Sequence, residues 1–219
     1  MDRIEEYIGF KFLTDAEMGK RMVKKKYEKQ EIFLLNEIPN VATMSVLELG
    51  GCLGVVSVAT NQMLENKNNH IVVEANPKMI RYLQHNRILN NCKFQIENAI
   101  ISDSHDGVFY SYDKLVAGSA HRMDSKEKNK TKHTVNVISY KDLVSKYKIE
   151  FDVLIIDIEG GELEILKEIR EINSIKYIMI EIHEKLMYPG FRKECFDVLE
   201  NMEFILIKRC GKESFLFKK

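Results

Sequence analysis

Short apolar runs alternate along the chain with longer segments of helical period. Five runs are rich in apolar residues and end in glycine or polar residues: SVLELGG, HIVVEANP, KFQIENAIIS, FDVLIIDIEGGE and KYIMIEIHE. Such runs predict buried parallel strands, because helices cover both sides of a parallel sheet. The segments between most of them have the length and the polar faces of helices. This order predicts an α/β fold in which a mainly parallel sheet carries helices on both faces.

The two ends of the chain and one central segment depart from this alternation. Helix-forming residues in 15–37 predict one or two leading helices within 1–45. The last run, EFILIKRCGKESFLFKK, predicts an antiparallel hairpin that closes the sheet. Residues 117–134 contain almost no large apolar side chain, which predicts a mobile loop or lid. We expect residues 1–219 to form one domain, because this length suffices for a single core.

Composition and charge narrow the class of protein. Lysine and arginine number 33, as do aspartate and glutamate, so no excess positive charge is available to bind nucleic acid or an anionic membrane surface. No apolar stretch approaches the ~20 residues of a membrane helix, and the start MDRIEEY is not typical of a signal peptide. The four cysteines are scattered without a C-x-x-C pair, which predicts reduced thiols. We therefore expect a soluble, cytoplasmic protein without nucleic-acid or membrane partners, of open oligomeric state.

Two features at predicted strand ends indicate an adenosine ligand. Glu48, Gly50 and Gly54 form a Glu-x-Gly-x-x-x-Gly turn, in which glycine lets a ligand approach the backbone before the next helix begins. Glu74 ends the following strand, where a carboxylate can accept both hydrogen bonds of a ribose diol. Cys52 replaces the second glycine of the dinucleotide fingerprint, and no Gly-Lys-Ser/Thr loop occurs, so NAD and ATP fit less well. An acid before the glycines suits a cationic ligand such as S-adenosylmethionine.

Several of these segments resemble those of a known family. Four regions carry the resemblance: KYEKQEIFLL, VLELGGCLGVVSV, VVEANPKMIRYLQHNRILNN, and DVLIIDIEGGELEIL together with IMIEIHE. Their order and spacing resemble those of the FkbM-like methyltransferases over about positions 26–207, the lid excepted. The resemblance implies S-adenosylmethionine as methyl donor and a Rossmann-like class I methyltransferase fold. It also implies O-methylation of a hydroxyl on a sugar, a glycan or a related small molecule.

The resemblance further implies which residues bind the donor. The implied set is Tyr27, Glu28, Glu48, Gly50, Gly54, Glu74, Ala75, Asn98, Ala99 and Asp157. Within this set, Tyr27 and Glu28 would close over the donor, and Glu74 would bind its ribose. The chain departs from the family at Cys52, where Asn is frequent, and at Ile155, where Lys is frequent.

Acidic residues and one histidine stand at the ends of two predicted neighbouring strands. Methyl transfer is an in-line displacement at carbon, and a neutral alcohol needs a base to take its proton. The candidates are Asp157 and Glu159 on one strand and Glu181 and His183 on the other. Residues 149–184 hold ten acidic against three basic residues, and crowded carboxylates raise a neighbour's pKa or share a divalent cation. We hypothesise that His183 is the base and that Asp157 orients the acceptor or holds a metal, with Asp157, Glu181 and His183 as candidate ligands of Mg²⁺ or Mn²⁺.

Other interpretations compete with these assignments. Glu159 and Glu162 could satisfy helix N-terminal amides, where acids are favoured, and His183 could be hydrogen-bonded scaffolding. Residues 114–148 carry nine basic and three acidic residues, a charge that would either solvate a lid or bind an anionic acceptor such as a nucleotide sugar. The alternatives to a small-molecule O-methyltransferase are a methyltransferase of RNA or protein and a non-catalytic donor-binding subunit.

Overall fold

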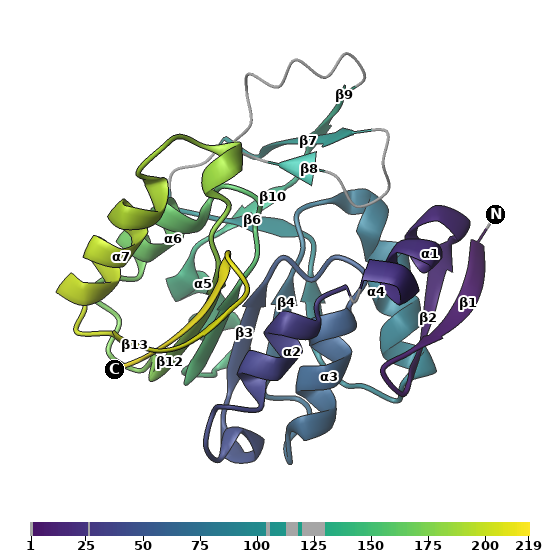
Figure 1. Ribbon diagram of the computed structural model, residues 1–219, viewed down its shortest axis with the longest axis horizontal. Coiled ribbons are helices and arrows are strands. Elements are labelled where there is room, and N and C mark those ends of the chain that lie inside the picture. The colour runs from purple at the N-terminus through teal and green to yellow at the C-terminus, as the bar shows by residue number, and fades with distance from the viewer. Residues whose placement is uncertain (1, 26, 104–105, 113–117, 120–129) are drawn as a thin grey trace.

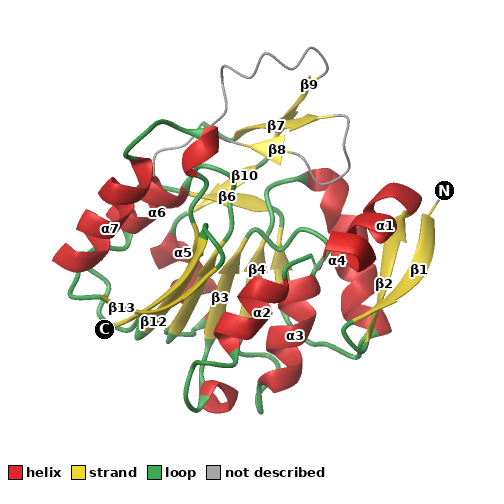
Figure 2. Cartoon of the chain, in the orientation of Figure 1, coloured by secondary structure: helices red, strands yellow, loops and turns green. Residues whose placement is uncertain are grey.

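A seven-stranded sheet forms the centre of the protein (Figures 1 and 2). The computed structural model describes residues 2–25, 27–103, 106–112, 118–119 and 130–219. The sheet order is β13-β14-β12-β11-β3-β4-β5, with all strands parallel except the hairpin of β13 and β14 at one edge. The strands are β3 (Val46–Leu49), β4 (His70–Val73), β5 (Gln95–Glu97), β11 (Val153–Ile156), β12 (Tyr177–Glu181), β13 (Ile205–Cys210) and β14 (Ser214–Lys218). The prediction of a mainly parallel sheet closed by a C-terminal hairpin is confirmed.

Helices cover both faces of this sheet because its side chains alternate between two apolar layers. Leu47 and Leu49 of β3 pack into the layer formed with α5 (Tyr140–Tyr147), α6 (Glu162–Glu168) and α7 (Phe191–Asn201). Val46 packs on the opposite face. That face is covered by α2 (Lys29–Leu35), α3 (Val55–Met63) and α4 (Pro77–Leu89). Short 3₁₀ helices span Val41–Thr43 and Glu184–Leu186.

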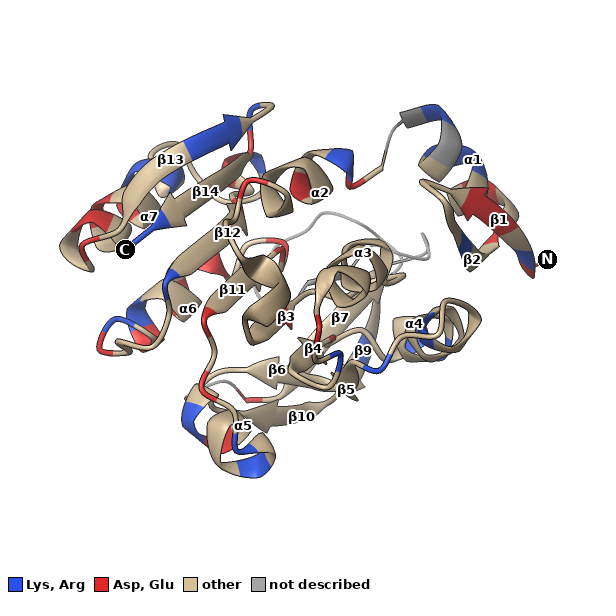
Figure 3. Ribbon diagram, turned by 90° about the horizontal axis from the view of Figure 1, so that it is seen from below, with Lys and Arg blue, Asp and Glu red and all other residues tan. Residues whose placement is uncertain are grey.

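Charged side chains lie mainly on the outer elements, whereas the central strands are mostly uncharged (Figure 3). This distribution follows from burial, since the strands are covered on both faces. Along the described parts of the chain, no helix combines the length and the apolarity that a membrane span requires.

The predicted leading helices are present as α1 (Ala16–Lys25) and α2, but the segment before them differs from the helices expected within 1–45. It begins with an antiparallel hairpin of β1 (Asp2–Tyr7) and β2 (Phe10–Asp15), and only then follows α1. Ile8 and Gly9 both have positive φ, 49° and 83°, the conformation of a tight two-residue hairpin turn. The side chain of Asn86 in α4 accepts from the Leu13 amide at 2.5 Å and donates to the Leu13 carbonyl at 3.2 Å. The edge of the hairpin is thereby tied to α4, a contact that no local sequence pattern reveals.

The segment KFQIENAIIS also differs from its prediction as one strand. It forms β5 in the central sheet and β6 (Ala99–Ile101), which pairs in parallel with β10 (Asn136–Ile138). The break falls at Asn98, whose amide group donates to the carbonyls of Glu74 and Ala75 at 2.8 and 3.2 Å. The chain therefore leaves the central sheet beside the end of β4.

The predicted lid at 117–134 is partly a strand. β9 (Lys130–Thr134) pairs antiparallel with β7 (Val108–Tyr112), which also pairs with β8 (Gly118–Ser119). This small sheet lies near β6 and β10 at the top of Figure 1. Residues 118–119 and 130–134 of the predicted loop are therefore paired strands, and their mobility stays a prediction. Residues 117 and 120–129 lie outside the described residues, and a lid there stays a prediction.

Candidate functional site

A cavity of about 610 Å³ opens at the carboxyl ends of β3, β4, β11 and β12. This is the position where open α/β sheets bind their ligands. Its wall contains most of the residues singled out by the sequence: Tyr27, Glu28, Gly50, Glu74, Ala75, Ala99, Asp157, Glu159, Glu181 and His183. Residues that are up to 156 positions apart in the chain therefore share one cavity.

The turn after β3 forms one wall through its backbone. Gly50 has φ of 93°, and a Cβ atom placed on it would meet the Asp157 carbonyl oxygen at 1.7 Å. Glycine is therefore required where this turn passes the end of β11. The Gly50 amide donates to the Val73 carbonyl at 2.9 Å, which fixes the turn against β4.

Glu74 joins two turns of the wall. Its Oε2 accepts from the Cys52 amide at 2.7 Å and its Oε1 accepts from the Asn76 amide at 2.6 Å. Burial raises the pKa of Glu74 to about 7, although these two amides favour the ionised form. Each carboxylate oxygen has a second lone pair, so the group can still accept hydrogen bonds from a ligand.

Tyr27 and Glu28 form the adjoining wall, before α2. The Tyr27 hydroxyl lies 3.4 Å from Cys52 Sγ, and Glu28 Oε2 accepts from the Val56 amide at 3.2 Å. Burial raises the pKa of Glu28 to about 8, and the negative charges of Glu31 and Glu48 also raise it. The wall therefore places a carboxyl group of elevated pKa against the first turn of α3.

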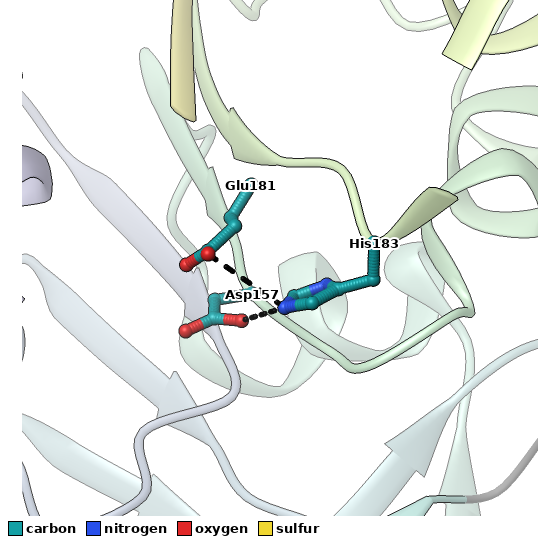
Figure 4. Close-up of side chains that lie close together, drawn as sticks. All are labelled: Asp157, Glu181 and His183. Atoms are coloured by element: carbon teal, nitrogen blue, oxygen red, sulfur yellow. Dashed lines mark ion pairs between the residues drawn. The ribbon is translucent and has the colours of Figure 1, made fainter. Parts of the chain in front are cut away.

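The strand ends of β11 and β12 bring together Asp157, Glu181 and His183 (Figure 4). His183 Nε2 lies 3.5 Å from Asp157 Oδ1 and 3.8 Å from Glu181 Oε1. Glu159, which is half exposed, has a carboxylate oxygen 4.0 Å from the same nitrogen. His183 Nδ1 lies 2.6 Å from Glu162 Oε1. The imidazole is thus surrounded by carboxylates, as the sequence predicts.

These contacts change the protonation of all three groups. Burial raises the pKa of Asp157 well above its usual value, and the negative charge of Glu181 adds to this effect. Burial likewise raises the pKa of Glu181 to about 7. Burial alone would lower the pKa of His183, but the hydrogen bond to Glu162 and the charges of Asp157 and Glu159 raise it to about 10.

The raised pKa of His183 weighs against the role of base hypothesised for it, and that role stays a prediction. With its pKa raised to about 10, the ring favours the imidazolium form, which has no free lone pair to accept a proton. In this state His183 supplies positive charge, and the two carboxyl groups beside it, Asp157 and Glu181, are better placed to accept a proton.

Three residues of the implied donor set do not line the cavity in the described structure. Glu48 is buried, with its carboxylate 3.0 Å from His70 Nε2 and 2.6 Å from the Ser57 hydroxyl. It lies one residue before the end of β3, so strand alternation turns its side chain toward α3 instead of toward the end of the strand. Gly54 precedes α3, and Asn98 supports the carbonyls of Glu74 and Ala75 from behind.

Other lining residues were not anticipated from the sequence. They are Arg21, Gln30, Glu31, Asn76, Met79, Ile100, Ile101, Phe109 and Glu213, among others. Glu31 did leave a signal. It shares the buried face of α2 with Leu34 and Leu35 at helical spacing, a place where a charged residue needs a partner, and it accepts from the Ser214 hydroxyl at 2.6 Å.

Comparison with known proteins agrees with this architecture. A family model described as the methyltransferase FkbM domain matches residues 48–214. The chain belongs to the FkbM methyltransferase family. The resemblance noted in the sequence is thereby confirmed, and the match spans every strand end that forms the cavity of this FkbM-domain protein.

Solved structures share the fold of the FkbM-domain protein at low sequence identity. A ribosomal protein L11 methylase from Lactobacillus delbrueckii subsp. bulgaricus has a TM-score of 0.54 at 10% identity, over 88% of this chain and 76% of that one. An O-methyltransferase from Bacillus cereus, in complex with SAH, has a TM-score of 0.50 at 13% identity, over 87% and 80%. The predicted class I methyltransferase fold is confirmed. Among curated proteins, none matches the chain.

Proposed function

We propose that this FkbM-domain protein transfers the methyl group of S-adenosylmethionine to a hydroxyl of a sugar, a glycan or a related small molecule. The observation that carries the proposal is one cavity with two chemically different sides. Around Glu74, on the donor side, backbone turns and apolar strand ends form a place for an adenosine group. Around Asp157, Glu181 and His183, on the acceptor side, acids surround an imidazolium.

The donor side matches the chemistry of S-adenosylmethionine. Glu74 can accept hydrogen bonds from the ribose diol while two backbone amides hold its carboxylate. Gly50 lets the donor approach the backbone. The donor's ammonium or sulfonium would favour the ionised form of the Glu28 carboxyl group, whose pKa burial raises to about 8. The complex of the Bacillus cereus O-methyltransferase with SAH, the product form of this donor, supports the same cofactor.

The acceptor side matches transfer to a neutral hydroxyl. The acceptor oxygen would attack the methyl carbon, the carbon–sulfur bond would break, and sulfur would leave with the electron pair as a thioether. The hydroxyl proton would pass to Asp157 or Glu181, because burial raises the pKa of both carboxyl groups and so makes their ionised forms stronger bases. The imidazolium of His183 would hold the two carboxyl groups in place and balance their charge.

A divalent cation also fits these residues, and it remains a prediction. Asp157, Glu181 and His183 each offer one ligand atom, and all three atoms lie within 4.8 Å of one another. Carboxylate oxygen and the nitrogen of a neutral imidazole are ligands that Mn²⁺ accepts, so a bound ion would displace the Nε2 proton of His183. Bound there, Mg²⁺ or Mn²⁺ would supply positive charge that favours the deprotonated acceptor.

Charge in the cavity favours a small neutral acceptor over RNA or a nucleotide sugar. Seven lining residues are acidic, against Arg21 and His183 as the basic ones. Phosphate groups would be repelled by this wall, because affinity for nucleic acid depends mainly on lysine and arginine at the phosphates. Transfer to RNA is therefore the weaker alternative.

The first test is calorimetric titration of S-adenosylmethionine into the purified protein, with and without Mg²⁺. We expect micromolar or tighter binding, no binding of NAD, and loss of binding in Glu74→Ala. A matched control is Glu97→Ala, which removes the acid at the end of the neighbouring strand β5, where it pairs with Lys146. Absence of donor binding by folded protein would refute the methyltransferase proposal.

The second test uses a radiolabelled methyl donor with a panel of methyl glycosides, free sugars, RNA and a protein extract. Transfer of label to a glycoside would confirm the acceptor class. Transfer that stops when a chelator is added would show that a metal is required, and transfer that continues would show that none is. Donor binding with label appearing only in RNA or protein would refute the sugar acceptor. Donor binding with no transfer to any class would favour the non-catalytic subunit.

A further inference from the structure

Glu162 is the most deeply buried acid near the acceptor side, and a helix-cap role does not account for its contacts. It is the first residue of α6 and is fully buried. Its Oε1 accepts from the Gly160 amide at 3.0 Å and lies 2.6 Å from His183 Nδ1. One carboxylate oxygen therefore joins the loop after β11 to the residue after β12.

The contact assigns the two edges of the His183 ring. A carboxylate can only accept, so His183 Nδ1 must carry a proton and donate it to Glu162. The Nε2 edge is then turned to the other side, where Asp157 Oδ1 lies at 3.5 Å and Glu181 Oε1 at 3.8 Å. Glu162 does not line the cavity, whereas Asp157, Glu181 and His183 do. It stands behind the imidazole, on the side away from the ligand space.

Burial of Glu162 is costly, which argues against an incidental role. Its second oxygen, Oε2, is buried without a hydrogen-bond partner among the described residues. A buried unsatisfied polar atom destabilises a fold, and such groups in native structures call for a reason. A helix-capping acid would not need this burial, since the exposed Glu164 already places negative charge in the same first turn.

We propose that Glu162 is a positioning residue that fixes the ring of His183, so that its Nε2 edge faces Asp157 and Glu181. It touches neither donor nor acceptor and acts only through His183. The spectroscopic part of the test below is independent of the proposed function, whereas the part that measures turnover rests on it.

The test compares Glu162→Gln and Glu162→Ala with Glu164→Gln. Gln keeps an oxygen for His183 Nδ1 and the Gly160 amide but removes the charge, whereas Ala removes both contacts. Glu164→Gln removes the same charge from an exposed position of the same helix turn. Circular dichroism and thermal unfolding select the variants that are folded at the assay temperature.

Nuclear magnetic resonance of ¹⁵N-histidine-labelled protein reads the contact directly. We expect a far-downfield Nδ1 proton for His183, assigned by its disappearance in His183→Gln. This signal should move upfield in Glu162→Gln, vanish in Glu162→Ala and stay unchanged in Glu164→Gln. An unchanged His183 signal in folded Glu162→Gln would overturn the proposal.

Turnover on the glycoside that the acceptor panel identifies supplies the second readout. In Glu162→Gln we expect kcat to fall about 10- to 100-fold, the range that groups orienting a histidine from behind usually give. The Kd of S-adenosylmethionine should stay within about twofold, because binding of the donor does not involve His183. Glu162→Ala should lose more kcat than Glu162→Gln, which makes Gln a partial rescue.

Full turnover in Glu162→Gln, or a loss of donor affinity equal to the loss of kcat, would contradict the positioning role. If no acceptor emerges, the sugar proposal fails while the resonance of His183 still decides the role of Glu162.

Discussion

The donor side and the acceptor side of the cavity are built from the same kinds of residue held in different ways. On the donor side, the carboxylate of Glu74 is fixed by two backbone amides at 2.7 and 2.6 Å. On the acceptor side, Asp157 and Glu181 face one imidazole at 3.5 and 3.8 Å. Backbone geometry sets the first arrangement, whereas charge balance among side chains sets the second.

This difference predicts which property each side controls. A carboxylate held by backbone amides keeps its position when a ligand arrives, so it contributes a preformed contact to binding. Carboxyl groups that share one imidazolium can take up or lose a proton as the reaction proceeds, and that property serves the chemical step. Substitutions on the donor side should therefore change Kd, and those on the acceptor side should change kcat.

Asp157→Asn is expected to produce the largest effect. Asparagine keeps the shape of the side chain but cannot act as a base, so kcat should fall by roughly 10²- to 10⁴-fold, the usual contribution of a general base. Asp157 also belongs to the donor set that the resemblance implies, so the Kd of S-adenosylmethionine, measured by calorimetry, separates its two roles. A change of less than about threefold assigns Asp157 to the chemical step, and a larger loss of affinity assigns it to the donor. Asp197→Asn is the control, because it removes a surface carboxylate of α7 that pairs with Lys193. If Asp157→Asn turned over nearly as fast as the control, the acceptor side would not control kcat, and the proposed difference between the two sides would be wrong.

The sequence predicted the frame of the site better than its side chains. Strand ends at Glu74, Asp157 and Glu181 follow from apolar runs whose limits are local properties of the chain, and the structure places all three at the cavity. Glu48 could not be placed in this way, because its direction depends on whether β3 ends at residue 49 or earlier, and strand boundaries are set by pairing.

Features that depend on distant partners were missed. The N-terminal hairpin is held by Asn86, more than 70 residues away. The protonation of His183 depends on Glu162, Asp157 and Glu159 together, and the sequence gives their number but not their distances. The sequence therefore predicted correctly that His183 lies in a cluster of acids. The charge of the ring could be inferred only from the distances in the structure.

Gly50→Ala is expected to have the next largest effect and probes the backbone that shapes the donor side. Its Cβ would overlap the Asp157 carbonyl oxygen, and alanine at positive φ adds about 1–2 kcal/mol of strain. The free energy of unfolding should fall by roughly 3 kcal/mol or more, measured by urea titration, and donor binding should be lost.

Gly190→Ala is the matched control for Gly50→Ala. Gly190 has a similar φ of 97°, but a Cβ there would meet nothing within 4 Å. We expect only the conformational cost of about 1–2 kcal/mol and unchanged donor binding. Equal effects of the two substitutions would mean that the contact between Gly50 and the Asp157 carbonyl does not shape the donor side.

The smallest effect concerns pH and isolates the carboxylate of Glu74. With a pKa raised by burial to about 7, Glu74 is mostly neutral at pH 6 and mostly ionised at pH 8. An ionised carboxylate accepts hydrogen bonds from a ribose diol more strongly, so affinity should increase with pH by up to about tenfold across this range. Adenosine is the suitable probe, because it carries the diol and has no group that titrates between pH 6 and 8. Glu28→Gln is the control, because Glu28 has a pKa of about 8 and could also titrate in this range. The variant should keep the pH dependence, since Glu28 lies beside α3 and not at the ribose. A carboxyl group of ordinary pKa is already fully ionised at pH 6. Adenosine affinity that stays constant from pH 6 to 8 would therefore show that the ribose does not bind a Glu74 whose pKa is near 7.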